Sequence, residues 1–441
     1  MNFYHATKLL VCCAFLPILW SVAFLPGPSL MGIAKVGLLT TILACAALLS
    51  ATTNYYQHTK PTFRLGLFSC IPIAAVLVTV ITAQILQATL PLQAWDALDF
   101  WLVAGFNERL DFEFPFSGDE PSLIKYQRHP LLLVNYYGFL LDTGMSAGCL
   151  GIILSVMPIL TGLLLCIALM TWGGIGTKAS AQLNTWPLLL LLTPIVENHI
   201  PLYGYSELYL AMGCMAIAVL LAKLLQQPAD PSTAMALIVT TALTASFRNT
   251  AIVNLLVIYV AFFCVVGLKM WGWKKISLII FASGLILAVM LALNQLDFQF
   301  LGTRYAIVVK EKVHVYGFGR SGVMPSFNVY ELTDTLMRSL FQNLSFTTSM
   351  VCTFMTMVLG YQNRSRRGVD FVVIFLALAG CGLMLVHIFG ILVFRHFANN
   401  AQPDFDTLGT RSLIPLTWIA AAYLGCFLNK PCNTLLENDQ I

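Results

Sequence analysis

Charged residues are scarce in this 441-residue chain. Only 10% of the residues are Asp, Glu, Lys or Arg, and 58% are hydrophobic, whereas soluble domains carry about a quarter charged residues. The composition therefore excludes an ordinary soluble protein and indicates an integral membrane protein. The formal net charge of +4 is small and scattered along the chain, which argues against a nucleic-acid-binding surface.

The sequence also lacks tandem repeats, low-complexity tracts and a separate soluble domain. Its 12 cysteines lie mostly inside apolar runs, without metal-ligand or paired spacing, and we expect buried free thiols that act as small hydrophobic residues. The first apolar run, LLVCCAFLPILW, follows Lys8 and has no small-residue cleavage site behind it. We therefore expect a retained first helix rather than a signal peptide.

Long apolar runs fill most of the chain. A helix needs about 20 apolar residues to cross a bilayer, which predicts an all-α polytopic membrane protein with about 11–13 transmembrane helices. A single membrane domain over 1–430 and a short cytoplasmic tail at 431–441 follow from this pattern. The expected spans lie near 9–25, 31–50, 66–90, 145–170, 185–199, 205–225, 232–246, 250–268, 276–293, 344–361, 371–393 and 412–428.

Charges between these spans divide between two sides. Basic residues concentrate in the short segments of one side, which the positive-inside rule makes cytoplasmic; they are Lys8, Lys60, Arg64, Lys178, Lys223, Lys269, Lys274, Lys275, Arg364, Arg366, Arg367 and Lys430. Most acids fall on the other side, in the long segments 91–130, 294–343 and 394–411. Aromatic residues in the first two of these segments suggest interfacial helices on the membrane surface.

The stretch QAWDALDFW places two carboxylates at a membrane edge. Asp96 and Asp99 are three residues apart and would share a helix face, and Trp95 and Trp101 are typical of an aromatic interface belt. Such acids can catalyse proton transfer or simply occupy a solvated helix end. Both interpretations stay open from the residues alone.

Two further stretches combine polar and aromatic residues on the same predicted side. His129 lies in RHPLLLVNYYGF, which is also consistent with an interfacial anchor. Glu197, His199, Tyr205 and Glu207 lie in ENHIPLYGYSELYLA, where a pair of polar residues more often ends a helix than binds a metal. The spacing from Glu197 to His199 matches no known metal motif, so no cofactor is expected, and a divalent metal is left as an open alternative.

Two arginines could neutralise an anion near the membrane. Arg248, in SFRNTA, lies between two apolar spans, where an ionisable residue is a functional hypothesis by default. It could instead extend to the interface as an ordinary snorkelling side chain. Arg411, in LGTRSLIPL, opens the last span, where an arginine is common.

In their order, these pieces resemble the GT-C glycosyltransferases, multi-span enzymes that use polyprenyl-phosphate sugars. The matching stretches, over about 66–428, are WDALDFW, RHPLLL, GYSEL, SFRNT and GTRSL. Two features depart from the family pattern. Arg248 followed by Thr250 replaces a common Lys followed by Glu, and the Asp-bearing loop comes after the third expected span rather than the first.

The resemblance implies an inverting transferase in the bacterial inner membrane, with its active site facing the periplasm. It implies Asp96 as the catalytic base and Asp99 as a secondary position. Arg248 and Arg411 would hold the donor phosphate, because a leaving phosphate needs neutralising cations. The other substrate-binding positions are His129, Glu197, His199, Tyr205 and Glu207. The partners would be a polyprenyl-phosphate-linked sugar and a glycan or glycolipid acceptor, such as a lipid-linked glycan, O-antigen or lipid A.

Two alternatives compete with this interpretation. A polymerase or ligase of lipid-linked polysaccharide would have a large external loop late in the chain, and 294–343 could serve. A transporter or flippase would show an inverted repeat and ionisable residues at mid-membrane. No repeat is visible in the sequence, and we find only Lys35 and Arg248 in apolar surroundings.

Overall fold

The computed structural model describes most of the expected helices in the middle and C-terminal parts of the chain. The described residues are 67–88, 147–172, 184–197, 206–226, 231–245, 247–248, 250–270, 296–300, 303–309, 313–317, 320–324, 329–362, 370–397 and 410–429. The expected features that lie outside them are the spans near 9–25, 31–50 and 276–293 and the segments 91–130, 398–409 and 431–441.

The helices follow the apolar runs closely. Among the described residues, four stretches are long and apolar enough to cross a membrane: Ser206–Leu225, Ala251–Met270, Phe371–Leu392 and Ser412–Asn429. They confirm a helical membrane protein. The helices are α3 (Leu67–Ala88), α6 (Ala147–Trp172), α7 (Thr193–Glu197), α8 (Ser206–Gln226), α9 (Pro231–Ala245), the helix Ala251–Met270, α11 (Val329–Gln342), α12 (Leu344–Gln362), α14 (Phe371–Phe397) and α15 (Thr410–Asn429).

The expected span 185–199 differs from a regular membrane helix. It consists of a 3₁₀ helix, η5 (Trp186–Leu192), followed by the five-residue α7. The Thr193 N–H donates to Leu190 O, three residues back. Pro194 has no N–H with which to make the α-helical bond to the same carbonyl, so the tighter turn persists up to it.

Two packed pairs fix the direction of α14 against the helix Ala251–Met270. Val257 lies directly over Gly382, and the rings of Phe262 and Phe375 meet edge to face, with centroids 6.0 Å apart. From the first pair to the second, the residue number rises from 257 to 262 along one helix and falls from 382 to 375 along α14. The two helices are therefore antiparallel.

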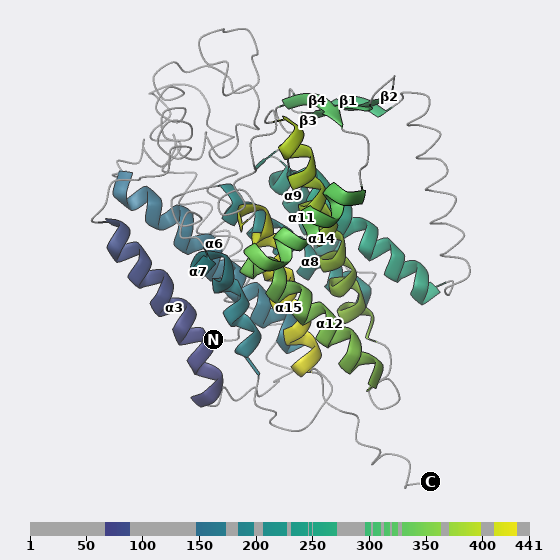
Figure 1. Ribbon diagram of the computed structural model, residues 1–441. Helices are drawn as coiled ribbons and strands as arrows, with labels where there is room; N and C mark the ends of the chain where they lie inside the picture. The colour runs from purple at the N-terminus through teal and green to yellow at the C-terminus, as the bar shows by residue number, and fades with distance from the viewer. Residues whose placement is uncertain are drawn as a thin grey trace, which may run out of the picture.

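The helix ends consequently gather at two ends of the bundle (Figure 1). At one end Arg248 binds Glu207 and His387 contacts Ser412; we call it the Arg248 end. At the other, Lys269 Nζ donates to a carbonyl of α8 at 3.0 Å, and the C-terminal residue of α15 pairs with the residues before η5. This is the alternation that the charge partition predicts, and it holds for the described helices from α6 to α15. Which end faces the periplasm stays a prediction.

The centre of the bundle is α15, which packs against α6, α8, α12, α14 and η5. Its Trp418 is 1% exposed and packs directly against Gly162 of α6, where a β-carbon would collide with the indole ring. Met170 fills the space over Gly425 in the same way. Small residues at helix contacts allow the close approach that is typical of packing in membranes.

Helix α12 shows which surface faces lipid. Its buried side carries hydroxyl side chains at helical spacing, Ser345, Ser349, Thr353 and Thr356, and Thr353 Oγ1 bonds the phenolic oxygen of Tyr423 on α15. Its exposed side carries Met350, Val351, Phe354, Met355, Met357 and Val358. Apolar residues outside and satisfied polar residues inside are the arrangement that a bilayer requires.

The segment 294–343 differs in part from the expectation. We expected interfacial helices there, and in its described residues a four-stranded antiparallel sheet precedes the helix α11. The strands are β1 (Leu296–Phe300), β2 (Thr303–Val309), β3 (Val313–Gly317) and β4 (Arg320–Met324), paired in sequence order. β-branched and aromatic residues are frequent in β2 and β3, and connections of two or three residues separate the strands, which favours a meander over a helix. The sheet lies at the Arg248 end, beside α14 (Figure 1).

Candidate functional site

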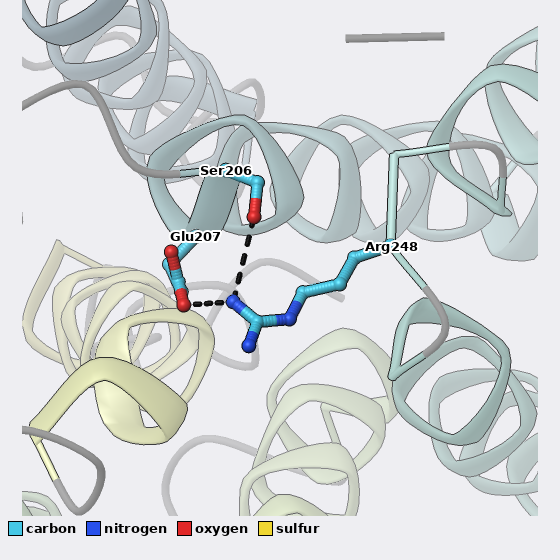
Figure 2. Close-up of polar contacts among 3 residues, drawn as sticks. All are labelled: Ser206, Glu207 and Arg248. Carbon is cyan, nitrogen blue, oxygen red and sulfur yellow. Dashed lines mark hydrogen bonds and ion pairs between the residues drawn. The ribbon is translucent and has the colours of Figure 1, made fainter. Parts of the chain in front are cut away.

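The clearest polar site among the described residues is centred on Arg248. Its Nη1 atom donates to Glu207 Oε1 in an ion pair, and it also lies 3.4 Å from Ser206 Oγ. Figure 2 shows the guanidinium extended across the gap between the two helix ends toward both acceptors. The side chain of Glu207 is 4% exposed and that of Arg248 is 20% exposed.

Local structure fixes both partners of the pair. Ser206 and Glu207 are the first two residues of α8, where a carboxylate is stabilised by the positive end of the helix dipole. Arg248 lies in the short connection after α9, and its carbonyl accepts from the Ala251 N–H at 3.0 Å as the next helix begins. Phe247 is fully buried beside it and meets the ring of Tyr209 edge to face at 5.8 Å. The neighbouring phenylalanine therefore anchors the turn that presents the arginine.

The chemistry of this site suits an anion. A carboxylate as buried as that of Glu207 requires a counter-charge, and Arg248 supplies it. The Arg248 side chain is partly exposed, and its guanidinium carries five N–H donors in a planar fork, which matches the oxygens of a phosphate. An anionic group that reaches the Arg248 end would thus meet a cation that is already positioned and only partly hydrated.

Glu197 has a clear role in building the fold. Its carboxylate accepts from Asn343 Nδ2 at 3.1 Å, from the Leu344 and Ser345 backbone N–H groups at 2.8 and 3.0 Å, and from Ser345 Oγ at 2.5 Å. It therefore caps the first turn of α12 from another element. The sequence predicts this residue at the substrate site, and the structure shows that α7 uses it to hold the junction between α11 and α12.

His387 is a buried polar residue that the sequence analysis missed. It lies within α14, 2% exposed, with Nδ1 2.7 Å from Ser412 Oγ and Nε2 3.5 Å from Ser339 Oγ. Its ring also lies against Phe346, with centroids 5.4 Å apart. A histidine inside the apolar run LMLVHIFG is the signal that could have found it, because ionisable residues within membrane spans are rare. It connects α11, α12 and α15.

Arg411 is the second residue of α15, directly before Ser412. The N-terminus of a helix favours an anion, and this one lies at the Arg248 end, beside the contact of Ser412 with His387. The structure thus places the backbone of Arg411 at the same end of the bundle as Arg248.

The remaining predicted site residues lie outside the described part of the chain: Asp96, Asp99, His129, His199 and Tyr205. Of the nine predicted positions, the structure brings Arg248 and Glu207 into contact and places Glu197 and Arg411 at the same end. Within the described residues, no group of three His, Cys, Asp or Glu side chains comes together as a metal site.

Comparisons with protein-family models, with curated proteins and with solved structures find no match to this chain.

Proposed function

We propose that this chain is a membrane glycosyltransferase of the GT-C class. It would move a sugar from a polyprenyl-phosphate donor to a lipid-linked glycan, an O-antigen intermediate or lipid A. The observation that carries the proposal is the Arg248 guanidinium, held by Glu207 and Ser206 at the end of a membrane bundle and 20% exposed. A charge in such a position is expensive to maintain and points to a function, and a lipid phosphate is the anion that the bilayer itself would deliver.

The proposed reaction divides into proton removal and phosphate departure. Asp96 accepts the proton of the acceptor hydroxyl, whose oxygen attacks the anomeric carbon from the face opposite the phosphate, so that the configuration inverts. The bond from that carbon to the phosphate oxygen breaks, and the polyprenyl phosphate leaves with the electron pair. Arg248 and Arg411 neutralise the charge that develops on it. Asp99 is the secondary carboxylate beside the base.

The proposed location is the bacterial inner membrane, with the site facing the periplasm. This assignment is supported by the lysines at the opposite end of the bundle. Lys269 contacts the last turn of α8, and Lys223 belongs to that same turn. Short basic segments remain on the cytoplasmic side, so the Arg248 end would be periplasmic.

The phosphate contacts can be tested by donor binding to the full-length protein in lipid nanodiscs. Replacing Arg248 or Arg411 with Ala should weaken binding of a polyprenyl-phosphate sugar by on the order of tenfold to a hundredfold, the usual effect of losing a charge-assisted contact. Arg248→Lys should retain part of the affinity. Arg338→Ala is the matched control, because Arg338 pairs with Asp334 on the surface of α11. Unchanged affinity in both Ala variants would contradict the phosphate site.

A second candidate is a polymerase or ligase of lipid-linked polysaccharide. The observation that favours it is the ordered late segment, in which a four-stranded sheet and α11 lie at the Arg248 end. Mass spectrometry of surface glycans with and without the gene separates the two functions. A glycosyltransferase predicts the loss of one hexose from an otherwise complete glycan. A polymerase predicts single repeat units, and a ligase predicts loss of the whole polysaccharide from its lipid.

A further inference from the structure

Helix α11 packs Leu332, Leu336 and Leu340 against the core of the bundle and also carries large apolar side chains on its exposed face. Over its 14 residues, Thr335 and Ser339 are buried, at 1% and 0% exposure, whereas Tyr330, Met337 and Phe341 are 79%, 47% and 85% exposed. Separations of seven and four residues put the three exposed apolar side chains on one face. We call them the α11 strip. In water a helix would turn such a strip toward the core.

Contacts at the buried face hold α11 in this orientation. Ser339 Oγ lies 3.5 Å from His387 Nε2 on α14, and the backbone N–H of Asn343, just past the helix, donates to Ser339 O at 3.2 Å. Asn343 in turn donates to the carboxylate of Glu197, which also caps α12. Rotation of α11 to bury the α11 strip would break these contacts. The contacts therefore keep the strip on the outer surface of the bundle.

The occupant that fits the strip is the lipid bilayer. One residue after α11 the chain enters α12, and the apolar exposure continues there through Leu344 at 49% and Phe354 at 67%. The strip therefore adjoins a surface that faces lipid. The helix is about 21 Å long at 1.5 Å per residue, too short to cross a bilayer. Asp334 and Arg338, an ion pair about a third exposed, add a charged group beside the apolar residues, which is typical of helices that lie in the interface.

We propose that α11 is an interfacial helix whose Tyr330, Met337 and Phe341 insert into the leaflet at the Arg248 end. The opposite face packs on the bundle and places Ser339 against His387, so the same helix joins the bilayer surface to the polar end of the bundle. This inference concerns a membrane contact and does not depend on glycosyl transfer.

Site-specific photocrosslinking of the full-length protein tests it. A benzophenone amino acid is placed at Met337 or Phe341, the protein is reconstituted in vesicles of phosphatidylethanolamine and phosphatidylglycerol, and lipid adducts are counted by mass spectrometry after illumination. Gln342 is the control site, because it is exposed at the end of the same helix and, as the residue after Phe341, lies about 100° around the helix from it. We expect at least about fivefold more lipid adduct at Phe341 than at Gln342, as for a residue inserted in the acyl boundary.

The alternative results are distinct. Equal lipid adduct at Phe341 and Gln342 would overturn the proposal, and so would crosslinks from the strip to a second copy of this chain or to another polypeptide in place of lipid. Each labelled protein is first checked for a single species by size-exclusion chromatography. If a variant at Met337 or Phe341 fails this check, Tyr330 supplies an independent probe of the same face, with the same expected excess over Gln342.

Discussion

Removing Arg248 should destabilise the protein much more than neutralising its partner. Arg248→Ala leaves the Glu207 carboxylate, 4% exposed, without the counter-charge that its ion pair provides. Breaking a buried pair from one side costs about 3–5 kcal/mol, and the 20% exposure of Arg248 places the expected loss near the lower limit, about 3 kcal/mol. Glu207→Gln leaves a cation that can extend toward water and an amide oxygen that still accepts, so we expect about 1 kcal/mol.

The double variant isolates the ion pair. With both charges gone, Arg248→Ala with Glu207→Gln no longer buries a carboxylate that has lost its ion pair with Arg248, so it should be more stable than Arg248→Ala alone by about 1–3 kcal/mol. A second substitution that restores stability cannot be explained by lost packing, because it adds no packing of its own.

The assay compares the unfolding of the wild type, the two single variants and the double variant in the same detergent or nanodisc. Unfolding free energies are measured by reversible denaturation where it can be achieved, and otherwise the proteins are ranked by their thermal midpoints. Arg338→Ala, which opens a partly exposed i,i+4 pair on α11, should change stability by less than about 0.5 kcal/mol. Equal, small and additive effects of the two single variants would refute the reasoning. They would mean that Glu207 is hydrated and that the pair is a surface contact.

The remaining predictions concern catalysis, packing and sidedness. Asp96→Asn should bind donor but transfer sugar about a hundredfold to ten-thousandfold more slowly, with Asp99→Asn milder; normal turnover by Asp96→Asn with an inactive Asp99→Asn would move the base three residues. Gly162→Ala should lower the thermal midpoint clearly, because a β-carbon meets the rigid indole of α15, whereas Gly390→Ala, with open space around it, should leave the midpoint unchanged; equal midpoints would contradict the close contact. Single cysteines placed at the Arg248 end should react with a membrane-impermeant maleimide from the periplasm, and labelling from the cytoplasm alone would invert the topology.

Most membrane helices were readable from the sequence because hydrophobic length depends on the bilayer and not on the partners of each helix. The expected spans 205–225 and 412–428 match α8 and α15 to within two residues at each end. The alternating direction of the described membrane helices from α6 to α15 was also predictable, because short basic segments remain on one side of the membrane. The sheet was not predicted, since strands of five to seven residues give a weaker signal than a long apolar run and aromatic residues suit both structures.

At the candidate site, sequence alone identified residue types and order, and tertiary structure decided which side chains meet. Arg248 and Glu207 were both singled out, but only the packing of α9 and the following helix beside α8 makes them an ion pair. Glu197 was expected at the substrate site, and its cap on α12 spans nearly 150 positions of the chain, which no local pattern records. The position of His387 against Ser412 and Ser339 depends likewise on how three helices pack. Local sequence determines where a helix begins and how apolar it is, whereas the partner of a buried polar group is chosen by whichever distant segment the fold places beside it.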